Sequence, residues 1–321
     1  MLHGLLTYKE GTSFYNLGDY VQSLAARQYL PRVDVLLNRE QLAKYDGPPL
    51  KLIMNGWFTH DPDNWVPAPT IIPRFVSFHI NSSAADRMLS PRGIDYLRLH
   101  SPIGCRDHHT VSLLREKGID AYFSGCLTLT LSGYGVTTPR RSEDILVDPF
   151  FNLPSLAHLF ATPKSFLRGL AQGDILRLGH RRNLLRRGLS THLLTRMGHV
   201  TQELPSGRED DEQKFRRAES CLARYAGARL VITSRIHCAL PCLAMGTPVV
   251  FLNAFDSFVD TCRFDGLLDL FNRIDFDPDG LPKANFGASC PWDGSEVPEN
   301  PRHHLLLSAA LRDSCTRFID G

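Results

Sequence analysis

Arg235 and His237, two residues apart, are the side chains of this sequence best suited to chemistry on an anionic substrate. A guanidinium group is planar and permanently charged, and it matches a carboxylate or phosphate with paired hydrogen bonds. An imidazole can give or take a proton near neutral pH. The structural alternative is that Arg235 forms a salt bridge and His237 caps a helix. The Arg-x-His pattern is too common to decide between these interpretations. Its position in the predicted fold is what favours a functional role.

The residues around this pair predict a βαβ unit. Apolar, β-branched runs at Leu230–Thr233 and Pro248–Phe251 indicate two buried parallel strands. His237–Met245 is long enough for a helix, and Gly246 occupies the usual position after a helix end. This arrangement places Ser234–His237 at the carboxyl end of the first strand, where open α/β sheets bind ligands. The unpaired N–H groups and the positive dipole end of the helix favour an anion there.

The composition is that of an ordinary globular protein of two domains. A length of 321 residues fits two α/β domains of about 150 residues. Hydrophobic residues make up 43% and charged residues 22%, and no apolar run reaches the ~20 residues of a membrane span. The N-terminus lacks the features of a secretion signal, so we expect a cytoplasmic protein with eight reduced cysteines. Cys238 and Cys242, one helical turn apart, favour packing over ligation, and we expect no metal.

One segment is strongly basic, although the formal net charge is only +2. Arg177–Arg196 is rich in arginine and contains no acid. One interpretation is peripheral contact with the inner membrane face or with a polyanionic acceptor. The other, which the leucine content favours, is a solvated helical face whose leucines pack inward. We expect no nucleic-acid partner, because no aromatic pattern or known motif accompanies the arginines.

Polar residues in the first half of the chain also follow predicted strands. Asn16 and Asp19 lie at the start of a helix after the first strand, where capping explains one of them. Gly18 between them suggests close approach of a ligand or another backbone. Asn55 and Trp57 follow a later strand, and the tryptophan is either a platform for stacking a sugar or a cover for the core edge.

Arg106 and Asp107 mark a second junction of strand and helix. Asp107 is placed to cap the helix, and Arg106 is placed to meet an anion from the first domain. We predict one Rossmann-like domain over residues 1–135 and another over 136–300. Residues 301–321 are predicted to form a helix that packs back on the first domain.

Three further expectations concern connecting segments. The polar run Ser132–Glu143 is typical of a domain linker. Phe258–Phe271 is predicted to be helical, and the Pro- and Gly-rich residues Asp275–Asn300 are predicted to be loop.

With these residues in place, the chain resembles the polysaccharide pyruvyl transferase family. The resemblance depends on four segments in family order, Asn16–Tyr20, Pro102–Asp107, Phe123–Thr128 and Ser234–His237. It extends from residue 16 to about residue 251 and is much more specific than any one motif. It implies an α/β fold of two Rossmann-like domains with parallel sheets, arranged as in GT-B glycosyltransferases.

The resemblance also implies an activity. Members transfer the pyruvyl group of phosphoenolpyruvate to a sugar, forming a cyclic ketal and releasing phosphate, with no cofactor. The second domain is expected to bind phosphoenolpyruvate and the first to bind the sugar acceptor. Arg235 and His237 match the family's donor-binding and catalytic Arg-x-His, with Ile236 where leucine is common. Substrate binding is assigned by position to Ser234, Ile236, Arg106, Asn16, Gly18, Asn55 and Trp57.

The reaction needs one group to protonate the methylene carbon and another to take the proton of the attacking hydroxyl. As a hypothesis, we assign the first role to His237 and the second to Asp19. Two other functions stay open, namely a GT-B glycosyltransferase with a nucleotide-sugar donor and a non-catalytic glycan-binding protein. The sequence leaves the acceptor open as well, whether free, nucleotide-linked or lipid-linked.

Overall fold

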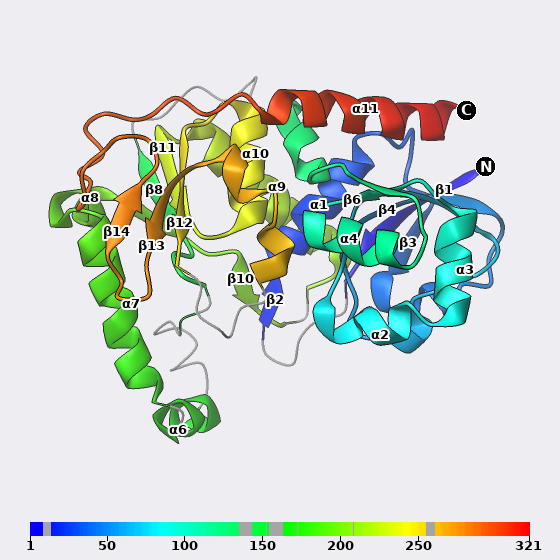
Figure 1. Ribbon diagram of the computed structural model, residues 1–321, viewed down its shortest axis with the longest axis horizontal. Coiled ribbons are helices and arrows are strands. Elements are labelled where there is room, and N and C mark those ends of the chain that lie inside the picture. The colour runs from blue at the N-terminus through cyan, green and yellow to red at the C-terminus, as the bar shows by residue number, and fades with distance from the viewer. Residues whose placement is uncertain are drawn as a thin grey trace.

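Two β-sheets lie side by side in this protein, each covered by helices (Figure 1). The computed structural model describes residues 1–8, 14–134, 143–151, 153, 163–171, 173–207, 209–254 and 261–321. We call the part built on the first sheet the first domain and the part built on the second sheet the second domain. Most of the predicted linker lies outside the described residues.

The first sheet has six strands in the order β3-β1-β4-β5-β6-β7, and every neighbouring pair is parallel. Its helices and 3-10 turns connect successive strands. The strands are β1 (Leu2–Thr7), β3 (Val35–Asn38), β4 (Leu50–Phe58), β5 (Ile71–Ile80), β6 (Ile103–Cys105) and β7 (Ala121–Phe123). The connecting elements are α1 (Leu17–Arg27), η1 (Arg39–Lys44), η2 (Pro62–Asn64), η3 (Ser82–Ala84), α2 (Ala85–Met88), α3 (Pro91–Leu99), α4 (His108–Glu116) and η4 (Leu127–Tyr134).

The second sheet also has six strands, in the order β14-β13-β12-β11-β8-β9. Five are parallel, whereas β14 is antiparallel to β13, which corrects the expectation of an entirely parallel sheet. The strands are β8 (Asp144–Val147), β9 (Gly198–Val200), β11 (Leu230–Thr233), β12 (Val249–Asn253), β13 (Asn272–Phe276) and β14 (Pro282–Ala284). The helices are α6 (Pro163–Ala171), α7 (Asp174–Gly188), α8 (Thr191–Arg196), α9 (Asp211–Gly227) and α10 (Ile236–Met245).

The predicted βαβ unit is confirmed as β11, α10 and β12. Its strands pair in parallel and every residue of β11 is buried, as expected for a central strand covered on both faces. Gly246 ends α10 in the left-handed conformation with φ of 71°.

Each sheet has one point at which the strand order reverses. In the first sheet β3 lies on one side of β1, and β4 with its successors lies on the other. In the second sheet β9 and β11 lie on opposite sides of β8. Such switch points leave a crevice outside the carboxyl ends of the strands, where ligands of open α/β sheets bind.

Several contacts join the two domains. The short strand β2 (Phe14–Asn16) of the first domain pairs antiparallel with β10 (Glu203–Pro205) of the second. Tyr20 of α1 donates a hydrogen bond to Asp211 at the start of α9 (2.7 Å), and η4 packs against α10. The last helix, α11 (His304–Asp320), crosses from the second domain to lie along the first, with its end near the N-terminus (Figure 1).

Two predictions for connecting segments need correction. The described part of Phe258–Phe271 contains only the 3-10 turns η5 (Thr261–Phe264) and η6 (Leu268–Leu270), because Gly266 adopts a positive φ of 82° that interrupts a helix. The predicted loop after Asp275 contains β14, which the edge of the sheet accommodates despite Pro282.

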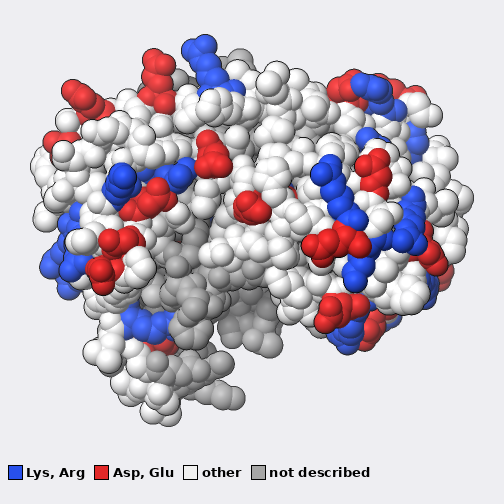
Figure 2. Space-filling view, in the orientation of Figure 1, with Lys and Arg blue, Asp and Glu red and all other residues white. Residues whose placement is uncertain are grey.

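The basic segment forms α7 and α8, and its leucines at 184, 189 and 193 are buried in the core of the second domain. This is the inward packing that the structural interpretation predicts. Figure 2 shows positive and negative side chains interspersed over both domains on the face drawn. Among the described residues, no helix combines the length and apolarity needed to cross a membrane.

Candidate active site

The N-terminus of α10 presents the Arg-x-His pair to a cleft between the domains. Arg235 occupies the N-cap position and His237 the second helical position, and neither side chain caps the helix. The predicted alternative of a capping histidine is therefore wrong.

The alternative that Arg235 forms a salt bridge is correct. Its Nη2 lies 2.6 Å from Oε1 of Glu203, and its Nε lies 3.3 Å from Oδ2 of Asp148. The guanidinium also lies over the ring of Phe151, 4.7 Å from its centre. Both carboxylates belong to the second domain, so they hold the arginine at the edge of the cleft without closing the cleft.

The cleft has a volume of about 360 Å³ and is lined by both domains. Nearly all the first-domain residues in its wall follow the carboxyl ends of β3, β4, β5 and β6 or begin α1. The second domain contributes the start of α10, a residue before β10 and a residue of η5. The lining residues are Asn16, Asp19, Arg39, Trp57, His60, Asn81, Arg106, Gln202, Arg235, Ile236, His237 and Arg263.

Several lining side chains have a buried nitrogen that makes no hydrogen bond to the described residues, although Nε of Arg235 keeps its ion pair with Asp148. These atoms include Nη1 of Arg39, Nε of Arg106, Nε of Arg235 and Nε2 of His237. A buried polar group without a partner typically costs about 1–3 kcal/mol, and more when it is charged. A ligand rich in anionic oxygens would supply the missing acceptors.

The positive charge of the cleft controls the protonation of His237. Burial, followed by the charges of Arg106, Arg263 and Arg235, holds the pKa of His237 well below its ordinary value. His237 is therefore neutral in the empty site at neutral pH. It can act as a proton donor only when a bound anion offsets this charge.

Arg106 lies beside a buried histidine–aspartate pair. Nδ1 of His79 is 2.6 Å from Oδ2 of Asp107, whose other oxygen accepts the N–H of Thr110 at 2.8 Å and so caps α4 as predicted. Nε of Arg106 lies 3.9 Å from Oδ2 of Asp107. Burial and the charge of Arg106 lower the pKa of His79 to about 4. Burial opposes ionisation of Asp107, but His79 and Arg106 outweigh it and lower the pKa of Asp107.

The start of α1 packs closely against α10. Asn16 caps α1 by accepting the N–H of Gly18 at 3.0 Å. A Cβ atom on Gly18 would lie 3.1 Å from Nδ1 of His237, so any other residue would press on the imidazole. Nε2 of Gln22 donates to Oδ1 of Asp19 at 3.1 Å and orients this carboxylate.

The structure brings most of the predicted site residues to one cleft. Asn16, Asp19, Trp57, Arg106, Arg235, Ile236 and His237 line it. Three others lie behind the wall that the described residues form. Gly18 supports His237, Ser234 donates to the carbonyl of Leu252 (2.8 Å), and Asn55 donates to the carbonyl of Gln22 (2.9 Å). Ser234 and Asn55 are buried and donate to backbone carbonyls, and neither lines the cleft.

Five lining residues were missed from sequence, namely Arg39, His60, Asn81, Gln202 and Arg263. Arg39 directly follows β3, much as Arg106 and Arg235 follow β6 and β11, so the same position at a strand end would have identified it. Arg263 lies in a segment predicted to be helical, and Gln202 carries no sequence signal.

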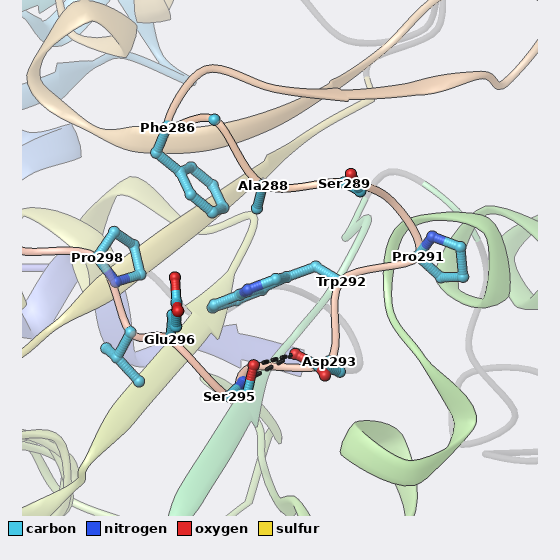
Figure 3. Close-up of a pocket in the computed structure, with 11 residues that line it drawn as sticks. Phe286, Ala288, Ser289, Pro291, Trp292, Asp293, Ser295, Glu296 and Pro298 are labelled. Atoms are coloured by element: carbon cyan, nitrogen blue, oxygen red, sulfur yellow. Dashed lines mark hydrogen bonds between the residues drawn. The ribbon is translucent and has the colours of Figure 1, made fainter.

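A second hollow, of about 580 Å³, is formed by the segment from Phe286 to Pro298 after β14 (Figure 3). Trp292 and Phe286 face each other there, and Asp293 accepts hydrogen bonds from Ser295. The hollow is larger than the cleft, but no arginine or histidine of the described ranges lines it. It therefore lacks the groups that the predicted chemistry requires.

Comparison with known proteins bears on this site. The family model described as polysaccharide pyruvyl transferase matches residues 16–256, which include every predicted site residue. No curated protein matches the chain. A crystal structure of a protein of uncharacterised function from Klebsiella pneumoniae subsp. pneumoniae NTUH-K2044 is similar, with 11% identity and a TM-score of 0.41 over 83% of this chain and 88% of that one. So remote a likeness leaves the GT-B-like arrangement a prediction.

Proposed function

Because the chain belongs to the polysaccharide pyruvyl transferase family, we propose that it transfers the pyruvyl group of phosphoenolpyruvate to a sugar of a polysaccharide or its precursor. The reaction forms a cyclic ketal and releases phosphate. The observation that carries this proposal is the meeting of Arg106, Arg235 and His237 in one cleft, each with a buried nitrogen that makes no hydrogen bond to the described residues. They provide donors for a small ligand that bears both a carboxylate and a phosphate.

Donor binding follows from the charges of both domains around the start of α10. Arg106, Arg235 and Arg263 are the three cations that act on His237. Phosphoenolpyruvate carries up to three negative charges, so it matches these cations and the N-terminus of α10. When it binds, Arg235 exchanges part of its contact with Glu203 for the donor.

The chemistry then proceeds in two bond-forming stages. Nε2 of His237 gives a proton to the methylene carbon of the donor, which becomes a methyl group as the C=C electron pair is used. An oxygen of the acceptor forms a bond to the neighbouring carbon, and Asp19 takes the proton of that hydroxyl. A second hydroxyl of the sugar then bonds to the same carbon while the bond to phosphate breaks, and its proton leaves with the phosphate. Positioned acid and base groups typically contribute about 10²- to 10⁴-fold each.

Protonation of His237 depends on the donor itself. The three arginines keep the imidazole neutral in the empty cleft, whereas the negative charge of the donor raises its pKa. The acid is thereby formed only in the presence of its substrate.

We propose the cytoplasm as the compartment, because all eight cysteines are free thiols. If the acceptor is lipid-linked, we propose that the basic helix α7 contacts the inner membrane face.

The first experiment is calorimetric titration of phosphoenolpyruvate into the wild type and Arg235→Ala. We expect the wild type to bind and the variant to lose at least ~10-fold in affinity. If neither binds while a nucleotide sugar does, the protein is instead a glycosyltransferase. Glycan binding without any phosphate release in the presence of phosphoenolpyruvate would indicate a non-catalytic relative.

The roles of acid and base need a separate test. We expect His237→Ala and Asp19→Asn each to lower turnover at least ~10²-fold while the donor still binds Asp19→Asn. Near-normal turnover of Asp19→Asn beside an inactive His237→Ala would show that another group is the base.

A further inference from the structure

We propose that Arg39 binds an anionic group of the acceptor, a carboxylate or a phosphate, so that the acceptor is a charged sugar. That the bound anion belongs to the acceptor rests on the function proposed above, whereas the anion site itself is argued from residues of the first domain alone. The inference starts from Arg39, which lines the cleft although it is only 3% exposed.

Arg39 is held rigidly in the wall of the cleft. It is the first residue of η1, directly after β3, and its guanidinium lies between two rings, 4.8 Å from the centre of Tyr8 and 4.9 Å from that of Trp57. Stacking of this kind fixes the plane of the guanidinium and leaves its N–H donors available.

Glu40 engages one edge of that plane. Its Oε1 accepts hydrogen bonds from Nε (2.9 Å) and Nη2 (2.8 Å) of Arg39. Its Oε2 accepts the hydroxyl of Thr59 and the N–H groups of His60 (2.9 Å) and Asp61 (2.8 Å). Burial opposes ionisation of Glu40, but these contacts lower the pKa of Glu40, which stays charged. The carboxylate is therefore shared among several donors and only partly neutralises Arg39.

The opposite edge of the guanidinium has no such partner. Nη1 of Arg39 is buried and donates no hydrogen bond to the described part of the chain. Burial and the charge of Asp19 raise the pKa of Tyr8 while Arg39 lowers it, so both charges lie near the Tyr8 hydroxyl. An unpaired cationic N–H in a fixed position selects an anionic oxygen.

The position of Arg39 separates it from the donor. His237 responds to Arg106, Arg263 and Arg235, which are already matched by phosphoenolpyruvate, whereas Arg39 is not among the charges that act on it. Arg39 instead lies on the side of the proposed base, Asp19, where the attacking hydroxyl must be. Arg39 is thus a cation that the donor does not need, and we infer that it meets negative charge on the second substrate.

The topology of the sheets leads to the same assignment. Arg235 follows β11 and Asp148 follows β8, so the donor side of the cleft is the switch point of the second sheet. Arg39 follows β3 and Trp57 lies near the end of β4, the strands on either side of β1, so this pair marks the switch point of the first sheet. Each sheet thus presents its own ligand crevice to the common cleft, one for each substrate.

The test compares matched sugars on the wild type, Arg39→Met and the exposed control Arg302→Met. D-Glucuronate, D-galactose 1-phosphate and neutral methyl glucoside are titrated into each protein, with and without saturating phosphoenolpyruvate. We expect the wild type and Arg302→Met to bind at least one anionic sugar at least ~10-fold more tightly than the neutral one, and Arg39→Met to lose this difference. Preference for glucuronate indicates a uronic acid, and preference for the sugar phosphate indicates a phosphate-linked acceptor.

Arg39→Met leaves Glu40 without its partner, so the double variant Arg39→Met/Glu40→Gln guards against a folding defect. It removes both charges, and we expect it to match the thermal stability of the wild type more closely while still lacking the anion preference. Equal binding of charged and neutral sugars by the wild type, or an anion preference that survives in the folded double variant, overturns the inference. Binding of phosphoenolpyruvate is measured in the same titrations. If the wild type does not bind it, the proposed function is contradicted, whereas the anion preference due to Arg39 is still tested by the sugars alone.

Discussion

The imidazole of His237 is surrounded by positive charge, and this has a measurable consequence. Burial and this charge hold its pKa well below the ordinary value in the empty site. Under the function proposed above, the anionic donor raises it on binding. At a pH between the two values, donor binding must take up a proton, so affinity for phosphoenolpyruvate falls as the pH rises through the higher value. We expect the binding enthalpy near pH 7 to vary with the ionisation enthalpy of the buffer.

The matched control for proton uptake is His237→Gln, which keeps a polar group but cannot titrate. It is expected to bind the donor without dependence on the buffer. The same buffer dependence in both proteins would assign the proton to another group, such as the donor phosphate.

A second consequence at this scale concerns Glu203, which lies 2.6 Å from Nη2 of Arg235 and competes with an incoming anion. We expect Glu203→Gln to bind phosphoenolpyruvate and inorganic phosphate roughly three- to tenfold more tightly, because a competing charge is removed. Turnover should fall, since phosphate then leaves more slowly. Calorimetry with inorganic phosphate measures the first effect, and Glu212→Gln, exposed at the start of α9, is the control. Weaker anion binding by Glu203→Gln would show that this carboxylate orients Arg235 instead of competing for it.

At the scale of elements, the close contact of α1 with α10 depends on Gly18. A methyl group there would lie 3.1 Å from both Nδ1 of His237 and Oδ1 of Asn16. We expect Gly18→Ala to displace the imidazole and to reduce turnover at least ~10-fold, since small displacements of catalytic groups are costly. Assays of initial rate on the folded variant measure this effect.

Gly179 in α7 provides the matched control, because nothing lies within 4 Å of a Cβ atom built there. Gly179→Ala should keep full activity and raise stability by up to about 1 kcal/mol through helix propensity. If Gly18→Ala were fully active too, the packing of α1 against His237 would have no part in catalysis.

The buried pair of His79 and Asp107 connects β5 to the start of α4 and should make the fold sensitive to acid. The folded protein holds the pKa of His79 at about 4, whereas an unfolded chain takes up the proton near the ordinary value of 6.5. Stability is therefore complete above about pH 6.5 and falls as the pH drops toward 4, by roughly 3 kcal/mol in all and by roughly 2 kcal/mol at pH 5. Urea unfolding at pH 7 and pH 5 measures this, and His79→Gln should show a smaller difference between the two.

Local patterns explain which elements could be predicted. The βαβ unit around Arg235 was predictable because an apolar run, a helix-length segment and a terminal glycine all agree, and a strand end fixes where the polar residues lie. The 3-10 turns at Thr261–Phe264 and Leu268–Leu270 were not, because the positive φ of Gly266 between them depends on tertiary packing.

At the scale of the whole molecule, the meeting of distant segments limited the prediction. The unpartnered edge of Arg39 arises because Glu40 also binds Thr59 and the backbone after it, about twenty residues further along the chain. Glu203 reaches Arg235 because β10 crosses to pair with β2. Sequence periodicity does not predict such contacts between distant segments. The cleft could therefore be located from strand ends, but the pairing of its charges could not be predicted.

The position of α11 decides how this protein could be recombined. Although the helix follows the second domain in sequence, Ser308 donates to the carbonyl of Leu129 (2.9 Å) and Lys51 donates to that of Ile319 (3.0 Å), both across the first domain. A chimaera that exchanges the first domain with that of a relative must therefore transplant both ends of the gene together. Transfer of residues 1–134 alone would place a foreign helix on an unmatched surface, whereas transfer with residues 301–321 would keep each half with its own packing partner.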